Sequence, residues 1–254
     1  MAAAVRARGA ELAFVGVLGG KPVVGVDEEG LNRLAGSGVK LSTRDLPLAA
    51  ARGEDGGTTV AVTLFLAHRA GLDVAATGGI GGVHAGSARD ESADLIELSR
   101  TPVTLVCSGA KAILDLPATL ERLETLGVTV VGYGTDELPA FWSVESGLPL
   151  TRKVENPTEA AAVAREARAL GLPGAVLVCV PPPPGEALSM GESDHAVAHA
   201  LEEAGTLGIA GAALTPFLLA RVAEITDGRS LRANRALLEN NAAVAAEIAV
   251  AATR

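Results

Sequence analysis

The chain has 254 residues, of which 48% are hydrophobic and 20% are charged, a composition typical of a folded protein rather than a disordered one. The formal net charge of −9 argues against a general nucleic-acid surface, because neutralising phosphates requires dense lysine and arginine. Aromatic residues are 2% of the chain, too few for base-stacking platforms. A local basic pocket for a small anion remains compatible with this charge.

Short apolar runs alternate along the chain with longer helical patterns. This alternation predicts βαβ units, and hence a three-layer α/β/α fold with a mostly parallel central sheet. Most of the apolar runs are continuous, as expected for strands that are buried on both faces. The predicted strands are 12–17, 72–76, 103–107, 129–133 and 175–180, and the predicted helices are 28–35, 58–70, 92–99, 117–126 and 157–170.

The proline run 181–184 interrupts the pattern, and a helical C-terminal third follows it. Its predicted helices are 193–204, 216–225 and 234–252. We interpret residues 1–254 as a single domain. Cys107 and Cys179 both lie inside apolar runs, which favours buried thiols in a reducing compartment over a disulfide. The beginning of the sequence lacks the apolar core of a signal peptide, so we expect a cytoplasmic protein.

A glycine-rich turn, residues 77–84, follows the predicted strand 72–76. In open α/β sheets, ligands bind at the edge formed by the carboxyl ends of the strands. Its four glycines would let backbone N–H groups approach an anion, and Thr77 and His84 would add polar groups. The alternative is that the glycines only allow tight turns. The spacing is neither that of a dinucleotide-binding Rossmann loop nor that of a phosphate-binding P-loop.

An acidic cluster lies just beyond this turn. Asp90 and Asp94 are four residues apart across the start of a predicted helix, whose N-cap is expected to be Ser92 or Asp90. Carboxylates there would suit a hard divalent cation that keeps several waters. Capping of the helix and interaction with its dipole would explain the same residues without a metal, and the spacing alone favours that explanation.

Lys111 follows the strand 103–107 after Ser-Gly-Ala, in a chain where only four of the twenty-one basic residues are lysine. A lysine whose neighbours lower its pKa can attack a carbonyl, whereas arginine stays charged. The alternative is an ordinary surface lysine after a strand. Lys40 and Arg44 are candidates for gripping a phosphate. His195 and His199 have the spacing of metal ligands but no adjacent glutamate, so we give them little weight.

The order of these motifs resembles that of one known family. Lys40–Pro47, Gly57–Val60, Ala76–His84, Ser92–Asp94 and Val106–Lys111 are similar to pseudouridine-5′-phosphate glycosidase, which is related to indigoidine synthase A. The match continues through Gly132–Tyr133, Leu138–Phe141, Thr215–Glu224 and the segment from Asn234 to Ala249. No single motif is decisive, but the ordered set is specific.

The resemblance implies reversible cleavage of the C–C glycosidic bond of pseudouridine 5′-phosphate to uracil and ribose 5-phosphate. By the same resemblance, Lys111 forms a Schiff base with C1′ of the opened sugar. Such a bond has no leaving oxygen to protonate, so the two-carboxylate route of ordinary glycosidases is unsuitable, and an imine supplies the electron sink.

The family's other site residues map onto this sequence one by one. Asp90 matches the acid associated with Mn²⁺, and Asn234 matches an active-site asparagine. The positions that match substrate-binding residues are Lys40, Val60, Ser92, Ala93 and Asp94. Thr77 and His84 are added from the glycine-rich turn. The resemblance also implies a homotrimer.

The sequence departs from the family pattern at two places. Family members carry a preceding segment whose glutamate is the proton donor, whereas Glu28 and Glu29 of this chain belong to an unrelated helix. Val180 also stands where the family usually has asparagine. We therefore expect weak C–C cleavage with retained ligand binding. The alternatives are a sugar-phosphate-binding regulatory protein and a role in indigoidine pigment biosynthesis.

Overall fold

The computed structural model describes residues 1–85, 90–209 and 211–253. Its larger part is built on a five-stranded parallel sheet in the order β5-β6-β9-β7-β8. The strands are β5 (Val74–Ala76), β6 (Thr104–Cys107), β7 (Thr129–Tyr133), β8 (Lys153–Val154) and β9 (Val176–Cys179). This confirms the predicted parallel sheet, although β8 was not among its predicted strands.

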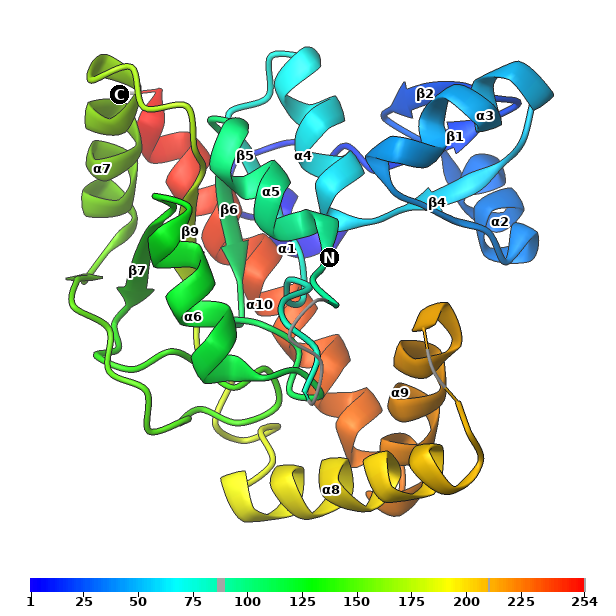
Figure 1. Ribbon diagram of the computed structural model, residues 1–254. Coiled ribbons are helices and arrows are strands. Elements are labelled where there is room, and N and C mark those ends of the chain that lie inside the picture. Colours follow the sequence, from blue (N-terminus) through cyan, green and yellow to red (C-terminus); the bar gives the residue numbers. More distant parts are fainter. Residues whose placement is uncertain (86–89, 210, 254) are drawn as a thin grey trace.

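Helices cover both faces of this sheet (Figure 1). On one face, Leu105 and Cys107 pack in a core with α4, α5 and α6; on the other, Val106 packs with α7 and α10. The alternation follows from the strand period of two. The predicted three-layer α/β/α fold is therefore confirmed. The bounds are α4 (Val60–Arg69), α5 (Ala93–Arg100), α6 (Leu116–Thr125), α7 (Pro157–Ala169) and α10 (Arg229–Ala252).

The N-terminal strands form a second, smaller sheet that the sequence analysis did not predict. Its order is β2-β1-β4-β3, with β1 antiparallel to both neighbours and β3 parallel to β4. The predicted strand 12–17 is therefore real in part, but it does not join the parallel sheet. Figure 1 shows these elements as a separate lobe beside α4. They are β1 (Val15–Leu18), β2 (Lys21–Val24), α2 (Glu28–Ser37), β3 (Lys40–Leu41), the 3-10 turn η1 (Thr43–Asp45), α3 (Leu46–Arg52) and β4 (Gly56–Thr58).

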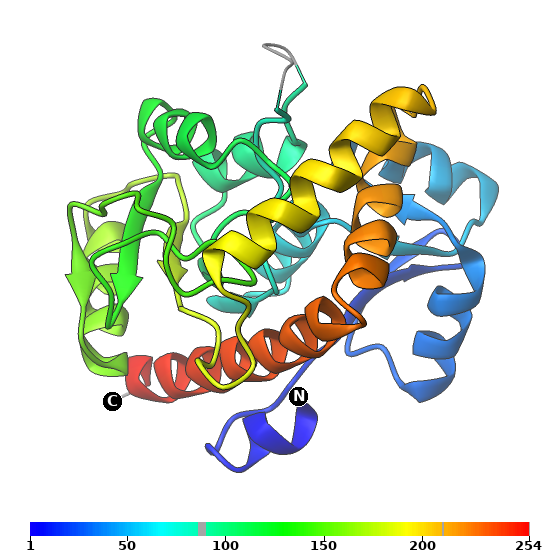
Figure 2. The ribbon, with the colours of Figure 1, turned by 90° about the horizontal axis from the view of Figure 1, so that it is seen from below.

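A helical hairpin precedes the long helix α10. It consists of α8 (Met190–Thr206), the 3-10 turn η2 (Gly211–Ala213) and α9 (Leu214–Ile225). Figure 2 shows α10, coloured orange to red, running along the lower part of the view from the end of α9 toward the C-terminus. The short helix α1 (Ala2–Arg6) packs against α10, where Arg8 also donates to Glu247 at 2.7 Å. The predicted helical C-terminal third is confirmed.

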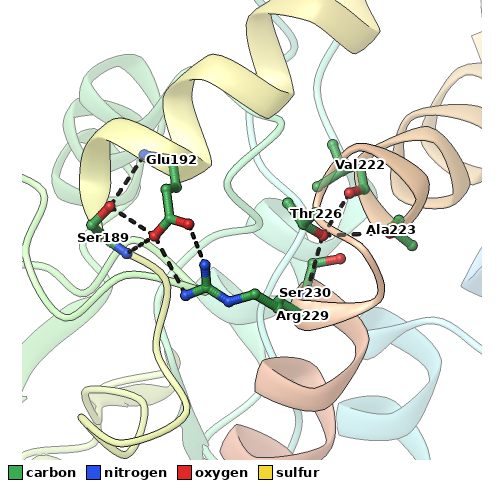
Figure 3. Close-up of polar contacts among 7 residues, drawn as sticks. All are labelled: Ser189, Glu192, Val222, Ala223, Thr226, Arg229 and Ser230. Atoms are coloured by element: carbon green, nitrogen blue, oxygen red, sulfur yellow. Dashed lines mark hydrogen bonds and ion pairs between the residues drawn. The ribbon is translucent and has the colours of Figure 1, made fainter.

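The start of α10 is fixed by polar contacts that Figure 3 shows in close-up. Ser189 caps α8, and the Glu192 carboxylate of the same capping box pairs with Arg229. The Thr226 hydroxyl donates to the carbonyl of Val222 at 2.7 Å and accepts the N–H of Ser230 at 3.2 Å. Consequently α10 begins at Arg229, earlier than the predicted residue 234, and Asn234 lies inside its second turn. In the described ranges, no helix has the length and apolar character that crossing a membrane requires.

Candidate active site

Lys111 is held beside the glycine-rich turn. The segment that leaves β6 pairs with the segment that leaves β5: Ser108 N–H donates to the Gly78 carbonyl at 2.8 Å, and Lys111 N–H donates to the Ile80 carbonyl at 3.1 Å. Between them, Ile80 N–H donates to the carbonyl of Gly109 at 3.0 Å. Both segments follow the carboxyl ends of neighbouring parallel strands, which is the edge where ligand sites form in open α/β sheets.

The surroundings of Lys111 favour its neutral form. Burial of the side chain is the largest cause of its lowered pKa, because an ammonium group is disfavoured away from water. The positive charge of Lys40 lowers the pKa further, and the negative charge of Asp94 opposes both effects. Lys40 comes from β3 in the smaller sheet, so the fold brings together charges from two lobes. The lowered pKa increases the fraction of Lys111 that is present as the neutral, nucleophilic amine at a given pH below 10.5.

Asp94 links three elements at this site. Its side chain is 4% exposed, and its two carboxylate oxygens accept the N–H groups of Ala61 at 2.9 Å and of Gly81 at 2.8 Å. Ser92, one of the two predicted candidates, is the N-cap of α5, and its hydroxyl accepts the Asp94 N–H at 3.2 Å. Although Asp94 lies in the first turn of α5, its carboxylate therefore binds the first turn of α4 instead of capping its own helix.

The glycine-rich turn is engaged mainly with the protein itself. Five of its eight backbone N–H groups already donate within the chain, namely those of Thr77, Ile80, Gly81, Val83 and His84. Two of its glycines allow close packing: a Cβ on Gly79 would lie 2.6 Å from the Phe141 ring, and one on Gly81 would lie 2.6 Å from the Ser92 Cβ. The turn is therefore packed tightly against the rest of the protein, and most of its N–H groups are already used within the chain.

The remaining predicted residues lie around this glycine-rich turn. Asn234 is half-buried on α10, and its Oδ1 lies 3.4 Å from the position of a Cβ on Gly78. Val60 is the first residue of α4, directly after the N-cap Thr59 and next to Ala61, which binds Asp94. Ala93 is exposed at the start of α5, and His84 is half-buried at the end of the turn.

The predicted metal site has few ligands among the described residues. Asp90 is exposed, and its backbone carbonyl accepts the N–H of His84 at 2.9 Å. The neighbouring Glu91 is paired with Arg122 at 3.0 Å. In residues 1–85, 90–209 and 211–253, no three His, Cys, Asp or Glu side chains cluster as a metal site. An exposed carboxylate of this kind would suit a hard divalent cation that keeps most of its waters.

Two residues that shape the site were not predicted. Asn241, which is fully buried on α10, donates from Nδ2 to the carbonyls of Thr77 at 2.9 Å and of Gly78 at 3.3 Å. Its amide also lies within hydrogen-bond distance of the Ser108 hydroxyl, which is buried as well. An asparagine inside an alanine-rich helix was the available signal, since a buried amide requires hydrogen-bond partners.

Comparison with known proteins gives a consistent set of relatives. Residues 1–251 match the family described as indigoidine synthase A like protein. The pseudouridine-5′-phosphate glycosidase of Gemmatimonas aurantiaca is 56% identical over 253 residues, covering 99% of this chain and 83% of that protein. The enzyme of the same name from Methylobacterium nodulans is 54% identical over 255 residues, covering 99% and 76%.

Two solved structures have the same fold. An indigoidine synthase A-like protein from Thermotoga maritima superimposes with a TM-score of 0.93 at 40% identity. The prealnumycin C-glycosynthase, solved in complex with ribulose 5-phosphate, superimposes with a TM-score of 0.92, also at 40% identity. Each superposition covers 99% of this chain and 84% of the other.

Proposed function

This chain belongs to the family of indigoidine synthase A like proteins, and we propose that it is a pseudouridine-5′-phosphate glycosidase. The reaction is the reversible cleavage of the C–C glycosidic bond to uracil and ribose 5-phosphate. The observation that carries the proposal is the half-buried Lys111 beside the glycine-rich turn, a lysine whose pKa is lowered and which feels the charges of Lys40 and Asp94. Relatives named for this activity, about half identical over nearly the whole chain, support the same substrate.

The chemistry follows from the neutral amine of Lys111. In the synthetic direction, the amine attacks the aldehyde carbon C1′ of open-chain ribose 5-phosphate, and loss of water leaves an imine. Once protonated, this imine accepts an electron pair from the uracil ring, the C–C bond forms, and the uracil carbon loses its proton. The 4′-hydroxyl then displaces the lysine amine from C1′ and closes the ribose ring. In the cleavage direction, the electron pair of that bond returns to the uracil carbon, which takes up a proton. Meanwhile the lysine nitrogen regenerates its double bond to C1′.

We place the 5-phosphate of the substrate at the beginning of α4. The N-terminus of a helix carries a partial positive charge that attracts an anion. Here the N–H groups of Ala61 and Val62 already donate to Asp94 and Thr59, so the attraction would come from the helix dipole and from Lys40. Val60 is the first residue of this ten-residue helix, and Lys40 adds a full positive charge from β3. In this arrangement Lys40 has two roles, because it binds the phosphate and lowers the pKa of Lys111.

Two finer features remain proposals that rest on the family resemblance. Asp90 would hold Mn²⁺ through bridging waters, and the ion would supply positive charge near the sugar phosphate. The steps above use only side chains of this chain. The homotrimer is the second feature, and sedimentation of the purified protein tests it.

Reductive trapping tests the proposed function. Protein mixed with ribose 5-phosphate and borohydride should gain the mass of the reduced sugar adduct, measured on the intact chain. Lys111→Ala and Lys111→Arg should both abolish the adduct, since neither supplies a neutral amine at this position. Lys153→Ala is the matched control, because Lys153 is an exposed lysine paired with Asp136.

The possible outcomes separate the alternatives. Trapping by Lys111→Ala at the wild-type level would show that another amine reacts. Binding of ribose 5-phosphate by the wild type without any trapping would favour the regulatory sugar-phosphate-binding protein over the enzyme.

A further inference from the structure

We propose that Phe141 is a positioning residue that braces the glycine-rich turn against the segment carrying Lys111. Phe141 lies in the loop after β7, far from Lys111 in the sequence. An effect of Phe141 on catalysis rests on the proposed function. Its structural content, the placement of the lysine amine, can be tested without substrate.

The backbone of Phe141 is the first observation. Its φ is +64°, in the left-handed region that bulky side chains rarely adopt. The residue is also 4% exposed, so the conformation is not that of a free surface turn. Such a conformation costs free energy and persists only where surrounding contacts hold it in place, often at functional sites.

The contacts that hold Phe141 are the second observation. Its N–H donates to the Ser108 carbonyl at 3.0 Å, at the exit of β6. Its ring lies on Gly79, so closely that a Cβ there would be 2.6 Å from the ring atom Cδ2. A Cβ on Gly109 would overlap the carbonyl oxygen of Pro139 in the same loop. The loop therefore touches both segments that meet at Lys111.

The two observations have one consequence for the lysine. Phe141 fixes the Ser108 carbonyl through its backbone and fixes Gly79 through its ring. The pairing of Ile80 with Gly109 and Lys111 lies between these two points. Weakening the brace should loosen this pairing and admit water around the Lys111 side chain. Because burial is the main cause of the lowered pKa, the pKa should then rise towards that of an ordinary lysine.

The test is the pH dependence of amine labelling in the resting, full-length protein. Lys111 and Lys153 are acetylated with acetic anhydride at a series of pH values, and each is quantified by peptide mass, with Lys153 as the internal reference. Phe141→Leu should raise the pH at which half of Lys111 is acetylated. It should also slow trapping of ribose 5-phosphate at neutral pH by roughly tenfold to a hundredfold, as expected for a misplaced reacting group.

Trp142→Phe is the matched control. Trp142 is the next residue, is 2% exposed, and has its ring 5.2 Å from that of Phe141. Within the described part of the chain its Nε1 has no hydrogen-bond partner, so the change deletes no such bond. If this loop had only a general packing role, both variants would shift the pH midpoint of Lys111 acetylation alike. If Phe141 positions the lysine as proposed, Trp142→Phe should keep the wild-type midpoint.

Gly79→Ala perturbs the same contact from the other side, because the added methyl group would lie 2.6 Å from the Phe141 ring and also 3.0 Å from the Gly109 carbonyl oxygen. It should shift the midpoint in the same direction, which keeps the test decisive if Phe141→Leu does not fold. Wild-type midpoints in both variants, or an equal shift in Trp142→Phe, would overturn the proposal. Failure of the wild type to trap ribose 5-phosphate would instead refute the proposed function and leave the labelling result valid.

Discussion

Replacing Gly81 by alanine tests whether the glycine-rich turn serves packing or the binding of an anion. The backbone of Gly81 is not among the glycines with positive φ, so alanine can adopt its conformation. The added Cβ has no space, however, because it would lie 2.6 Å from the Ser92 Cβ and 2.9 Å from the Asp94 Oδ2. The change therefore pushes on the two residues that hold the beginning of α5.

The expected loss of stability has two parts. Forcing a methyl group into a filled space costs about 1–3 kcal/mol. Lengthening or breaking the 2.8 Å hydrogen bond from Gly81 N–H to the buried Asp94 carboxylate adds up to about 1.5–3 kcal/mol. Added together, the two parts give roughly 1–6 kcal/mol, a large share of the roughly 5–15 kcal/mol that stabilises a typical domain.

Urea unfolding followed by tryptophan fluorescence measures this loss. Trp142 is the only tryptophan and is buried, so its emission reports on the core next to the turn. Gly205→Ala is the matched control, because Gly205 lies in α8 with nothing within 4 Å of an added Cβ. That substitution should be neutral or stabilising by up to about 1 kcal/mol.

The result that would refute this reasoning is a Gly81→Ala protein whose free energy of unfolding lies within about 0.5 kcal/mol of wild type, the range of an ordinary surface change. If such a protein bound ribose 5-phosphate only weakly, the turn would be an anion cradle after all. Loss of stability with unchanged affinity in the folded fraction would support the packing role.

Two further predictions concern charges. Lys40→Met should raise the pH at which half of Lys111 is acetylated, because it removes a positive charge that lowers the pKa of Lys111. Lys40→Arg keeps that charge and should leave this pH unchanged. Equal values in the two variants would contradict the effect of Lys40 on Lys111. Asp90→Asn should lower the manganese content of the purified protein with little change in unfolding. Because Ser92 is the N-cap of α5, the alternative role of Asp90 is interaction with the helix dipole alone. The variant would then lose about 1 kcal/mol of stability or less and keep the wild-type metal content.

The parallel sheet and its helices were predictable because their patterns are local. Continuous apolar runs such as 103–107 are long enough to identify as strands, and each is followed by an amphipathic helix. The smaller sheet lacks such signals. Its strands are two to four residues long, β2 contains Pro22, and β4 reads Gly-Gly-Thr. Their pairing depends on long-range contacts that no short window of the sequence contains.

The site, too, could be predicted only where its signals are local in the sequence. Lys111, Asp94 and Lys40 were predicted as candidates from their residue types and positions, and from the resemblance. The bonds of Asn241 to Thr77 and Gly78 cross more than half of the chain, so only the fold reveals them. The left-handed backbone of Phe141 is equally invisible in the sequence, since nothing about a phenylalanine predicts positive φ.

The burial of Lys111 also has a thermodynamic consequence for the whole protein. In the unfolded chain this lysine titrates near 10.5, whereas in the folded protein its pKa is lower. Below the folded pKa both states carry the proton, so the cost of burying an ammonium group opposes folding in full. As the pH rises through the interval up to 10.5, the folded state releases its proton first and that cost disappears. The nucleophile thus lowers the stability of the fold at neutral pH, and Lys111→Met should yield a protein that is inactive but more resistant to unfolding.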